Sequence, residues 1–429
     1  MPVSQAPPAS RPEEPREPDE ALVERFHAAG QGHVFRFLPK LDALGRARLL
    51  RSARSVDLRR VARLAAGDAL AAPLAAFEPL DGPPLVRRED LARDPDRRAR
   101  AEEVGRDLLK RGKVACVTVA GGQGTRLGFP GPKGCFPIGP GDRTLFDLHA
   151  AAIAAAAREA GRPIPWVIVV SPATEEGTRL HIRLRGLPGI EAASVRLACQ
   201  GTLPALDDGG LLILDAPDRI ATAPDGHGGA LRALRESGTL GWLVNLGVEE
   251  LSYFQVDNPL APPADPLFLG LHRLDDGRMS TKVFRKADPA ERVGVVVRAQ
   301  GRPAVVEYTE IPPDAAALRD AAGGLVHGAA NMAAHAIALP FAAAVAWKGL
   351  PVHRVRKKVP FTDADGRQVE PDAPNAWKFE TFIFDAMPLA ESGVVLEVER
   401  DREFAPVKNA EGPDSPETAR RLLQAAGRW

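Results

Sequence analysis

The residues best suited to chemistry lie in a glycine-rich stretch that ends at Lys133. A short run of apolar, β-branched residues (114–119) leads directly into the sequence Ala120-Gly121-Gly122-Gln123-Gly124-Thr125-Arg126-Leu127-Gly128. Because glycine allows tight backbone turns, several N–H groups of such a loop can face one anionic ligand. Arg126 and Lys133 add two positive charges beside them. This composition predicts a binding loop for a triphosphate, and the alternative is a glycine-rich surface turn with incidental basic residues.

The spacing of this loop differs from that of two commoner phosphate-binding motifs. A P-loop requires G-x-x-x-x-G-K-[ST], which does not occur in the sequence. A dinucleotide-binding loop requires G-x-G-x-x-G, and counting from Gly122 the third glycine position holds Leu127. The chain therefore has another kind of phosphate loop. This spacing also disfavours an alternative function, that of a nicotinamide-dependent oxidoreductase.

Polar residues also follow two other apolar runs. Gln200 comes directly after residues 195–199, and Asp257 comes directly after residues 253–256. An amide can donate and accept hydrogen bonds at once, as recognition of a nucleobase edge requires, although a glutamine at a strand end can also be structural. A carboxylate that faces a triphosphate can hold Mg²⁺, because phosphates and waters fill the other coordination positions. The alternative for Asp257 is a cap for the turn before Pro259.

The elements that must position these residues alternate between strand and helix. The sequence predicts strands at 114–119, 166–170, 195–199 and 252–256, and helices at 97–110, 144–160, from Ser171 onward, at 229–237 and at 416–424. This alternation indicates an α/β fold with a doubly wound, mostly parallel sheet. Ligands of such sheets bind at the carboxyl ends of the strands, where the glycine loop, Gln200 and Asp257 are expected. Farther along, residues 293–298 and 304–308 flank Gly301-Arg302-Pro303 and predict a hairpin.

Composition argues against several classes of partner. Lys and Arg together number 56, as do Asp and Glu, so the net charge is zero and no basic surplus favours nucleic acid. Cys116, Cys135 and Cys199 lack C-x-x-C spacing, which fits a reducing cytoplasm and gives no metal site. The most apolar long stretch, 333–347, is shorter than the ~20 residues of a membrane span. We therefore expect a cytoplasmic protein without nucleic-acid or membrane partners.

These residues carry a resemblance to a known family. The loop 120–128, continued by Pro132-Lys133-Gly134, resembles the signature loop of sugar nucleotidyltransferases in the form found in the UDP-N-acetylhexosamine pyrophosphorylases. UDP-glucose and UDP-sugar pyrophosphorylases carry related but different loops. Further elements follow in the family's order over roughly residues 100–424: Gln200 to Ala205, Ala223 to Gly229, Tyr253 to Asn258, Glu307, Asn331, Phe382 to Phe384 and Glu403 to Ala410. The resemblance implies a Rossmann-like nucleotide-diphospho-sugar transferase fold.

The resemblance assigns a role to each matching residue. The nucleotide is expected to contact Ala120, Gly121, Gly122, Gly124, Gln200 and Gly226, with Asp257 as the ligand of Mg²⁺. The sugar is expected to contact His227, Glu307, Asn331, Phe382 and Phe384. The expected catalytic residues are Arg126, Lys133 and Lys408, fixed cations beside the phosphates. The chain departs from the family pattern at His227, where relatives carry Asn, and at Ala334, where they carry a second Asn.

The implied activity is transfer of uridylyl from UTP to N-acetylglucosamine 1-phosphate, with release of pyrophosphate. The sugar phosphate is expected to attack the α-phosphorus in line, so that no protein nucleophile is needed. In reverse, the substrates would be the UDP-sugar and pyrophosphate. One alternative is a UTP–glucose-1-phosphate uridylyltransferase or a broad-specificity UDP-sugar pyrophosphorylase. Another alternative is a UDP-sugar-binding protein without catalysis.

Four segments are expected along the 429 residues. Residues 1–19, rich in Pro, Ser, Arg and Glu, are expected to form a disordered tail. Apolar residues at helical spacing over 20–66 and the start of the helix expected at 97–110 predict a helical N-terminal region over 20–105. The nucleotidyltransferase catalytic domain is expected over 106–390, and the short C-terminal segment 391–429 is expected to complete the site. We expect a monomer or a weak homo-oligomer.

Overall fold

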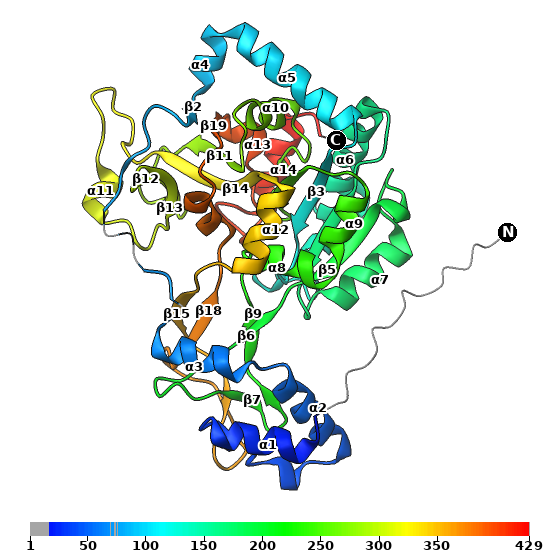
Figure 1. The fold of residues 1–429 in the computed structure, drawn as a ribbon, viewed down its shortest axis with the longest axis vertical. Coiled ribbons are helices and arrows are strands. Elements are labelled where there is room, and N and C mark those ends of the chain that lie inside the picture. Colours follow the sequence, from blue (N-terminus) through cyan, green and yellow to red (C-terminus); the bar gives the residue numbers. More distant parts are fainter. Residues whose placement is uncertain (1–16, 69, 73, 75, 429) are drawn as a thin grey trace, which may run out of the picture. The chain divides into compact units, whose positions relative to one another are not determined.

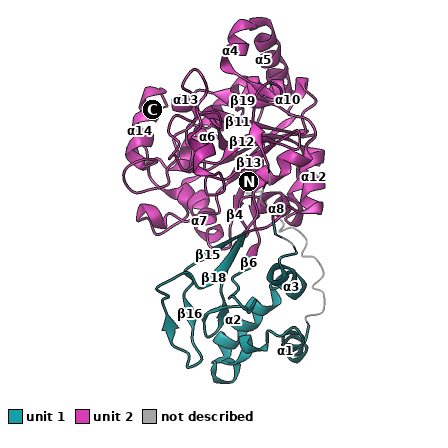
Figure 2. Ribbon diagram, turned by 90° about the vertical axis from the view of Figure 1, so that its left-hand side faces the viewer, with its two compact units in different colours: residues 1–70, 203–223, 354–379 teal, residues 71–202, 224–353, 380–429 magenta. Residues whose placement is uncertain are grey.

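A computed structural model describes residues 17–68, 70–72, 74 and 76–428 of the chain. The chain divides into two compact units, which Figure 2 colours separately. Unit 1 combines residues 1–70, 203–223 and 354–379, and unit 2 combines 71–202, 224–353 and 380–429. The boundaries expected at 105 and 390 do not coincide with these units. The expected tail, 1–19, lies mostly outside the described residues.

Unit 1 is discontinuous in sequence because two later segments pack onto the N-terminal helices. These helices are α1 (Asp19–Ala28), α2 (Ala43–Arg54) and α3 (Leu58–Ala66). The side chain of Gln31 binds the backbone of segment 203–223. Its Nε2 donates to the Gly210 carbonyl at 3.0 Å, and its Oε1 accepts from the Leu212 N–H at 2.9 Å. The expected helical region therefore exists up to residue 66, while the helices that follow it belong to unit 2.

Unit 2 is built on a mixed, mostly parallel sheet (Figure 1). The strand order is β2 (Leu85–Val86), β19 (Val395–Val398), β11 (Met279–Arg285), β14 (Ala329–Ala338), β10 (Glu250–Gln255), β3 (Val114–Val119), β4 (Trp166–Val170) and β5 (Val195–Cys199). Strand β14 runs antiparallel to both of its neighbours, and the other pairs along this path are parallel. The carboxyl ends of β3, β10, β11 and β19 therefore lie at one edge.

Helices cover both faces of this sheet, as a doubly wound fold requires. On one face lie α4 (Arg88–Arg93), α5 (Pro95–Lys110), α6 (Leu145–Ala160), α10 (Pro266–Leu274) and α14 (Pro416–Ala425); on the other lie α8 (Gly229–Glu236), α9 (Thr239–Asn245) and α12 (Leu339–Lys348). Helices α5 and α10 approach closely because each has a glycine that faces the backbone of the other helix. A Cβ on Gly105 would lie 1.8 Å from the Pro266 carbonyl oxygen, and one on Gly270 would lie 1.7 Å from that of Ala101.

The observed elements confirm the expected α/β sheet and refine several boundaries. The helix expected from Ser171 begins at Glu175 as α7 (Glu175–Arg185), because the Ser171 carbonyl accepts from the Thr174 and Glu175 N–H groups and forms a turn first. The expected hairpin is present as β12 (Val295–Ala299) and β13 (Arg302–Val306). Its turn lies at Gln300 and Gly301, both at positive φ, so that Arg302 already belongs to the second strand. In the described part of the chain, no helix is long and apolar enough to cross a membrane.

Candidate active site

The glycine-rich loop leaves β3 at the carboxyl edge of the sheet and folds back on itself. The Gly124 N–H donates to the Gly131 carbonyl at 2.8 Å, and the Lys133 N–H donates to the Gly122 carbonyl at 2.9 Å. Within the described residues, the N–H groups of Gly121 and Gly122 have no backbone acceptor. These two N–H groups are thus available to a ligand, whereas that of Gly124 closes the loop. Ala120, also predicted to contact the nucleotide, is fully buried at the start of the loop.

Gln200 joins this loop to a second glycine-rich turn. Its Nε2 donates to Asp225 Oδ1 and to the Gly226 carbonyl, at 3.2 Å each. Its Oε1 faces the first loop so closely that a Cβ on Gly121 would lie only 2.5 Å away. Gly226 has a φ of +84°, and a Cβ there would lie 2.3 Å from the Thr381 carbonyl oxygen. The structure therefore brings Gly121, Gln200 and Gly226 together. Glycine is required by space at 226, where the obstacle is backbone, whereas a larger residue at 121 would have to displace the Gln200 amide.

Asp257 and Lys133 meet at the ends of β10 and of the glycine loop. The Val256 N–H donates to the Val119 carbonyl at 3.1 Å, which places Asp257 beside the start of the loop. Lys133 Nζ lies 3.3 Å from Asp257 Oδ2, and the two side chains are only 18% and 13% exposed. The two charges lie close together but are loosely paired. Arg126, in contrast, is exposed, and the structure does not bring it to this pair.

Lys408 reaches the same edge from the C-terminal segment. The Val407 N–H donates to the Asp257 carbonyl at 2.8 Å, so the backbone of this segment is fixed to the end of β10. The Lys408 side chain is held weakly, with Nζ 3.8 Å from Asp414 Oδ2. Burial raises the pKa of Asp414, while Lys408 and Arg400 lower it in part. Segment 391–429 thus carries a cation to the edge that carries Asp257.

His227 belongs to a cluster of aromatic rings. Its ring stacks on Phe382 at a centroid distance of 5.3 Å and lies 5.6 Å from Phe384. Its Nδ1 accepts from the Ile383 N–H at 3.2 Å, so the neutral ring carries its proton on Nε2. Burial and the nearby His353 lower the pKa of His227 to about 4, and the ring is neutral at pH 7. Phe382 directly precedes a 3-10 helix, η7 (Ile383–Leu389), and Phe384 lies in its first turn.

Glu307 and Asn331 lie on either side of Gly294. The Gly294 carbonyl accepts from the Asn331 N–H at 2.9 Å, and a Cβ on Gly294 would lie 3.0 Å from Glu307 Oε1. Asn331 Oδ1 accepts from the Ala333 N–H at 3.0 Å, which supports the positive φ of 53° at Ala333 in the irregular pairing of β14 with β11. Burial and Glu310 raise the pKa of Glu307, while His353 and Lys408 lower it in part.

Sequence reasoning missed a histidine beside these residues. His353 Nε2 lies 2.9 Å from Asp385 Oδ2, and its ring centroid lies 4.5 Å from that of Phe382. Burial lowers the pKa of His353, but the hydrogen bond and charge of Asp385 outweigh burial, so the net shift is upward. Asp385 directly follows the Phe-Ile-Phe motif, which was the one local signal. Nothing near His353 in the sequence marks it, because its partners are distant along the chain.

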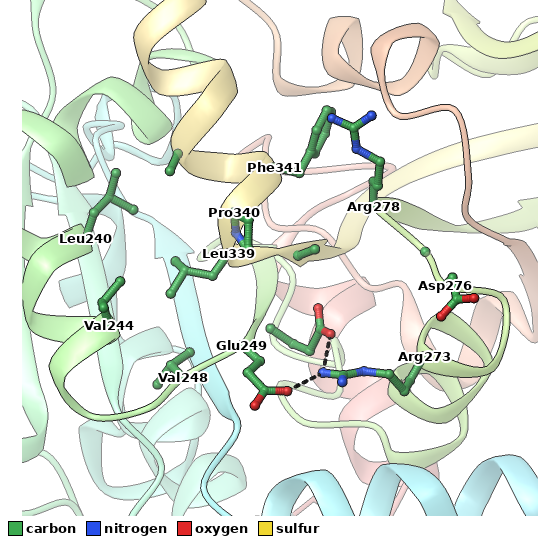
Figure 3. A pocket seen from close by; sticks show the side chains of 14 residues that line it. Leu240, Val244, Val248, Glu249, Arg273, Asp276, Arg278, Leu339, Pro340 and Phe341 are labelled. Atoms are coloured by element: carbon green, nitrogen blue, oxygen red, sulfur yellow. Dashed lines mark hydrogen bonds and ion pairs between the residues drawn. The ribbon is translucent and has the colours of Figure 1, made fainter.

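A hollow of about 840 Å³ lies at the opposite end of β10, away from all of these residues. Figure 3 shows its wall, in which Arg273 bonds to Glu249. Arg273 also bonds to Glu250. Apolar side chains such as Leu240, Leu339 and Phe341 complete the wall. Arg273 is already closely paired with these two carboxylates, and none of the residues that line the hollow belongs to the glycine-rich loop. The predicted site is therefore the better candidate for phosphate chemistry.

Comparisons with known proteins find relatives over most of the chain. A family model described as UTP–glucose-1-phosphate uridylyltransferase matches residues 74–414. UDP-N-acetylhexosamine pyrophosphorylase-like protein 1 of Homo sapiens is 39% identical over 428 residues, covering 94% of this chain and 84% of that protein. UDP-N-acetylglucosamine diphosphorylase 2 of Arabidopsis thaliana is 37% identical over 435 residues, covering 96% and 85%.

A solved structure is also similar. The uridine diphosphate N-acetylglucosamine pyrophosphorylase from Trypanosoma brucei, in complex with an inhibitor, matches with a TM-score of 0.81 at 29% identity. The match covers 96% of this chain and 86% of that one. Fold and sequence thus point to the same group of proteins.

Proposed function

The chain belongs to the UTP–glucose-1-phosphate uridylyltransferase family, and we propose that it makes UDP-N-acetylglucosamine and pyrophosphate from UTP and N-acetylglucosamine 1-phosphate. The observation that carries this proposal is the meeting of Lys133 and Asp257 beside the glycine loop, at the carboxyl ends of β3 and β10. A cation, a carboxylate and free backbone N–H groups at one sheet edge suit a nucleoside triphosphate. The relatives named above support the N-acetylated sugar as the acceptor.

In the proposed reaction, the sugar phosphate oxygen attacks the α-phosphorus of UTP and pyrophosphate leaves. The attacking phosphate is already an anion, so the protein must align two anions and reduce their repulsion. The Gly121 and Gly122 N–H groups, with Lys133, hold the pyrophosphate that leaves, and the exposed Arg126 side chain would turn toward it from the surface of the loop. Lys408 neutralises the phosphate that arrives. Gln200 Oε1 offers an acceptor to the uracil edge while its Nε2 is bonded within the protein.

The residues present fit a magnesium ion. In the part of the chain that the structure describes, no group of three or more His, Cys, Asp or Glu could hold a metal by itself. Magnesium suits such a site, because one carboxylate suffices when phosphates and waters supply the other ligands. Asp257 would hold it, and the bound ion would supply positive charge at the phosphate oxygens. Lys133 would then exchange its contact with Asp257 for one with phosphate.

The sugar pocket is proposed to be the space near His227, Glu307 and Asn331. His227 Nε2 offers one hydrogen-bond donor on a neutral ring, where the family's Asn would offer a donor and an acceptor. Glu307 can accept from two hydroxyls, and Asn331 keeps its Nδ2 for an acceptor on the sugar while Oδ1 is bonded to Ala333. Phe382 and Phe384 supply the apolar wall. The acetamido group would be read by this set in spite of Ala334.

The proposed setting is the cytoplasm, with the protein as a monomer or a weak homo-oligomer. Cys116, Cys135 and Cys199 are all free thiols, which suits a reducing compartment. Burial raises the pKa of Cys199 to about 11 and that of Cys135 to about 12. These thiols are therefore protonated at neutral pH and poorly reactive.

The direct test is product formation by the purified protein. We expect UDP-N-acetylglucosamine and pyrophosphate in equal amounts from UTP, N-acetylglucosamine 1-phosphate and MgCl₂, with loss of both products when EDTA replaces MgCl₂. The Asp257→Asn variant, which keeps the size of the side chain, should bind UTP but require more Mg²⁺. Tight binding of UDP-N-acetylglucosamine by the wild type without any product would favour the binding-protein alternative.

A further inference from the structure

A lysine that no motif marks is enclosed inside unit 2. Lys282, on β11, is 1% exposed, and its Nζ lies 2.6 Å from Asp265 Oδ2 and 2.6 Å from Glu403 Oε2. The same Nζ lies 5.3 Å from the centroid of the Phe268 ring. Burying a charge is costly unless it is paired and hydrogen-bonded. Burial alone would lower the pKa of Lys282, but the two carboxylates outweigh burial and raise it, so the side chain stays charged.

Glu403 is the first residue of the segment that carries Lys408. It ends α13 (Arg400–Glu403), and its carbonyl accepts from Asn258 Nδ2 at 2.8 Å. Asn258 Oδ1 accepts in turn from the Ala405 N–H at 2.9 Å. Two residues later, the Val407 N–H donates to the Asp257 carbonyl at 2.8 Å. The segment 403–408 is therefore tied to Asp257 and Asn258 through its backbone, and to Lys282 through the Glu403 carboxylate.

These ties matter because the Lys408 side chain is not itself held firmly. Its Nζ is 3.8 Å from Asp414, and the side chain is 35% exposed. The place of its ammonium group thus depends on where the backbone of the segment lies. Phe404 also packs against β11, because its ring centroid lies 4.7 Å from that of Phe284. Phe284 is two residues after Lys282 on this strand.

We propose that Lys282 is a positioning residue for uridylyl transfer, which acts through Glu403 and together with Asn258 to hold Lys408 at a fixed place relative to Asp257. This inference rests on the proposed function and goes beyond it. Lys282 does not touch substrate. Lys282 ties the start of segment 403–408, at Glu403, to β11, while Asn258 ties the same segment to the end of β10. A shift of about 1 Å in a group that aligns reactants can cost about 100-fold in rate.

The test is a double-mutant cycle on the steady-state kinetics of pyrophosphate release. We expect Lys282→Met to lower kcat by about 10- to 100-fold with a small change in KM for UTP. In a Lys408→Ala background, the same change should cost less than about threefold, because the group that Lys282 positions is gone. If the loss of kcat in the double variant equals the product of the losses in the two single variants, the proposal is overturned. A change confined to KM would overturn it as well.

A matched control is Arg273→Met. Like Lys282→Met, it removes a cation that is paired with a buried carboxylate of unit 2, here that of Glu250. Arg273 lies at the opposite end of β10, and we expect the variant to keep kcat within about twofold. If Lys282→Met does not fold, Asn258→Ala weakens the same segment without leaving a buried charge unpaired, and it should show the same non-additivity with Lys408→Ala.

Hydrogen exchange separates failure of this inference from failure of the proposed function. Faster exchange at the Ala405 and Val407 amides in Lys282→Met, relative to wild type, would support the positioning role even if the wild type released no pyrophosphate. Unchanged exchange at these amides would overturn the role even if the wild type were fully active.

Discussion

Strand β10 carries an acidic residue near each of its ends, and the surroundings of the two carboxylates differ. At its start, Glu250 Oε1 lies 2.6 Å from Arg273 and its Oε2 lies 3.0 Å from His272 Nε2. His272 continues the network through Nδ1, 2.8 Å from Ser280 Oγ. Beyond its other end, Asp257 has Lys133 at 3.3 Å. The Glu250 side chain is 5% exposed and that of Asp257 is 13% exposed.

The difference separates charge used for stability from charge kept for a ligand. Both oxygens of Glu250 are bonded within the protein, so the network is complete without a ligand and stabilises the fold. Asp257 and Lys133 lie close together with a long contact, so each has capacity for a phosphate or a metal ion. Groups fixed in advance around an incomplete site are what electrostatic catalysis requires.

The largest expected effect is on turnover. Lys133→Ala removes a cation from the phosphate site and should lower kcat/KM for UTP by about 10²–10³-fold. The matched control is Lys113→Ala, which removes a lysine paired with Glu249 at 2.8 Å at the opposite end of the same strands. It should stay within about twofold in the same assay. A loss of less than about tenfold in Lys133→Ala would contradict the role of Lys133.

For Glu250→Ala we expect a loss of stability with little change in activity. Removing this carboxylate leaves buried partners unsatisfied and should lower the free energy of unfolding by about 1–3 kcal/mol, as measured by urea denaturation. The kcat/KM of the folded protein should stay within about twofold of wild type. Asp257→Ala should change turnover strongly and the free energy of unfolding little. Equal stability losses in the two variants would remove the contrast between the ends of β10.

Near the carboxyl end of β10, protonation of His149 should make the free energy of unfolding depend on pH. His149 is fully buried, its Nε2 lies 3.0 Å from the Val256 carbonyl oxygen, and burial lowers its pKa from 6.5 to about 4. Between these pH values the unfolded chain binds the proton and the folded chain does not, so stability falls as pH falls from 6.5 toward 4. By pH 5 this histidine should account for about 1–2 kcal/mol of the loss.

Urea denaturation at pH 7 and pH 5 measures this contribution. We expect His149→Gln to lose less stability than wild type between the two values, because glutamine takes up no proton. An identical loss in the two proteins would mean that His149 does not contribute. His227, with a pKa also near 4, should act in the same direction.

The smallest expected effect concerns the contact between the two glycine turns. Gly121→Ala places a Cβ 2.5 Å from Gln200 Oε1 and must displace that amide. Loss of one hydrogen bond to the nucleotide should raise KM for UTP by up to about tenfold. Gly241→Ala, in open space on α9, is the control and should leave KM unchanged. An unchanged KM in Gly121→Ala would separate Gln200 from uracil recognition.

The parts of the fold that the sequence predicted are those with local signals. Apolar runs indicated β3 and β4 because almost all of their residues are buried on both faces of the sheet, and the glycine spacing indicated the loop before Lys133. Strand β5 lies at the edge of the sheet and is only partly buried. The antiparallel place of β14 had no local signal, because it depends on pairing with strands distant in the sequence. The same holds for unit 1, which gathers segments from three parts of the chain.

The roles of the site residues stay predictions, and the structure shows only which of these residues lie together. Asp257 and Lys133 meet as their motifs indicated, and Gln200 lies between the glycine turns. His353 and Lys282 were missed, since the partners that they contact lie far away in sequence, Asp385 for the first and Glu403 for the second. Such residues become visible only when the chain is folded.

The most direct test of the central claim compares two acceptors in the uridylyl transfer assay. Purified protein is given UTP and MgCl₂ with either N-acetylglucosamine 1-phosphate or glucose 1-phosphate, and pyrophosphate release is measured. We predict a kcat/KM ratio above about 100 in favour of the acetylated sugar, which corresponds to about 2.7 kcal/mol of discrimination in the transition state. A ratio near one would contradict the assignment of an acetamido-reading pocket to His227, Glu307 and Asn331.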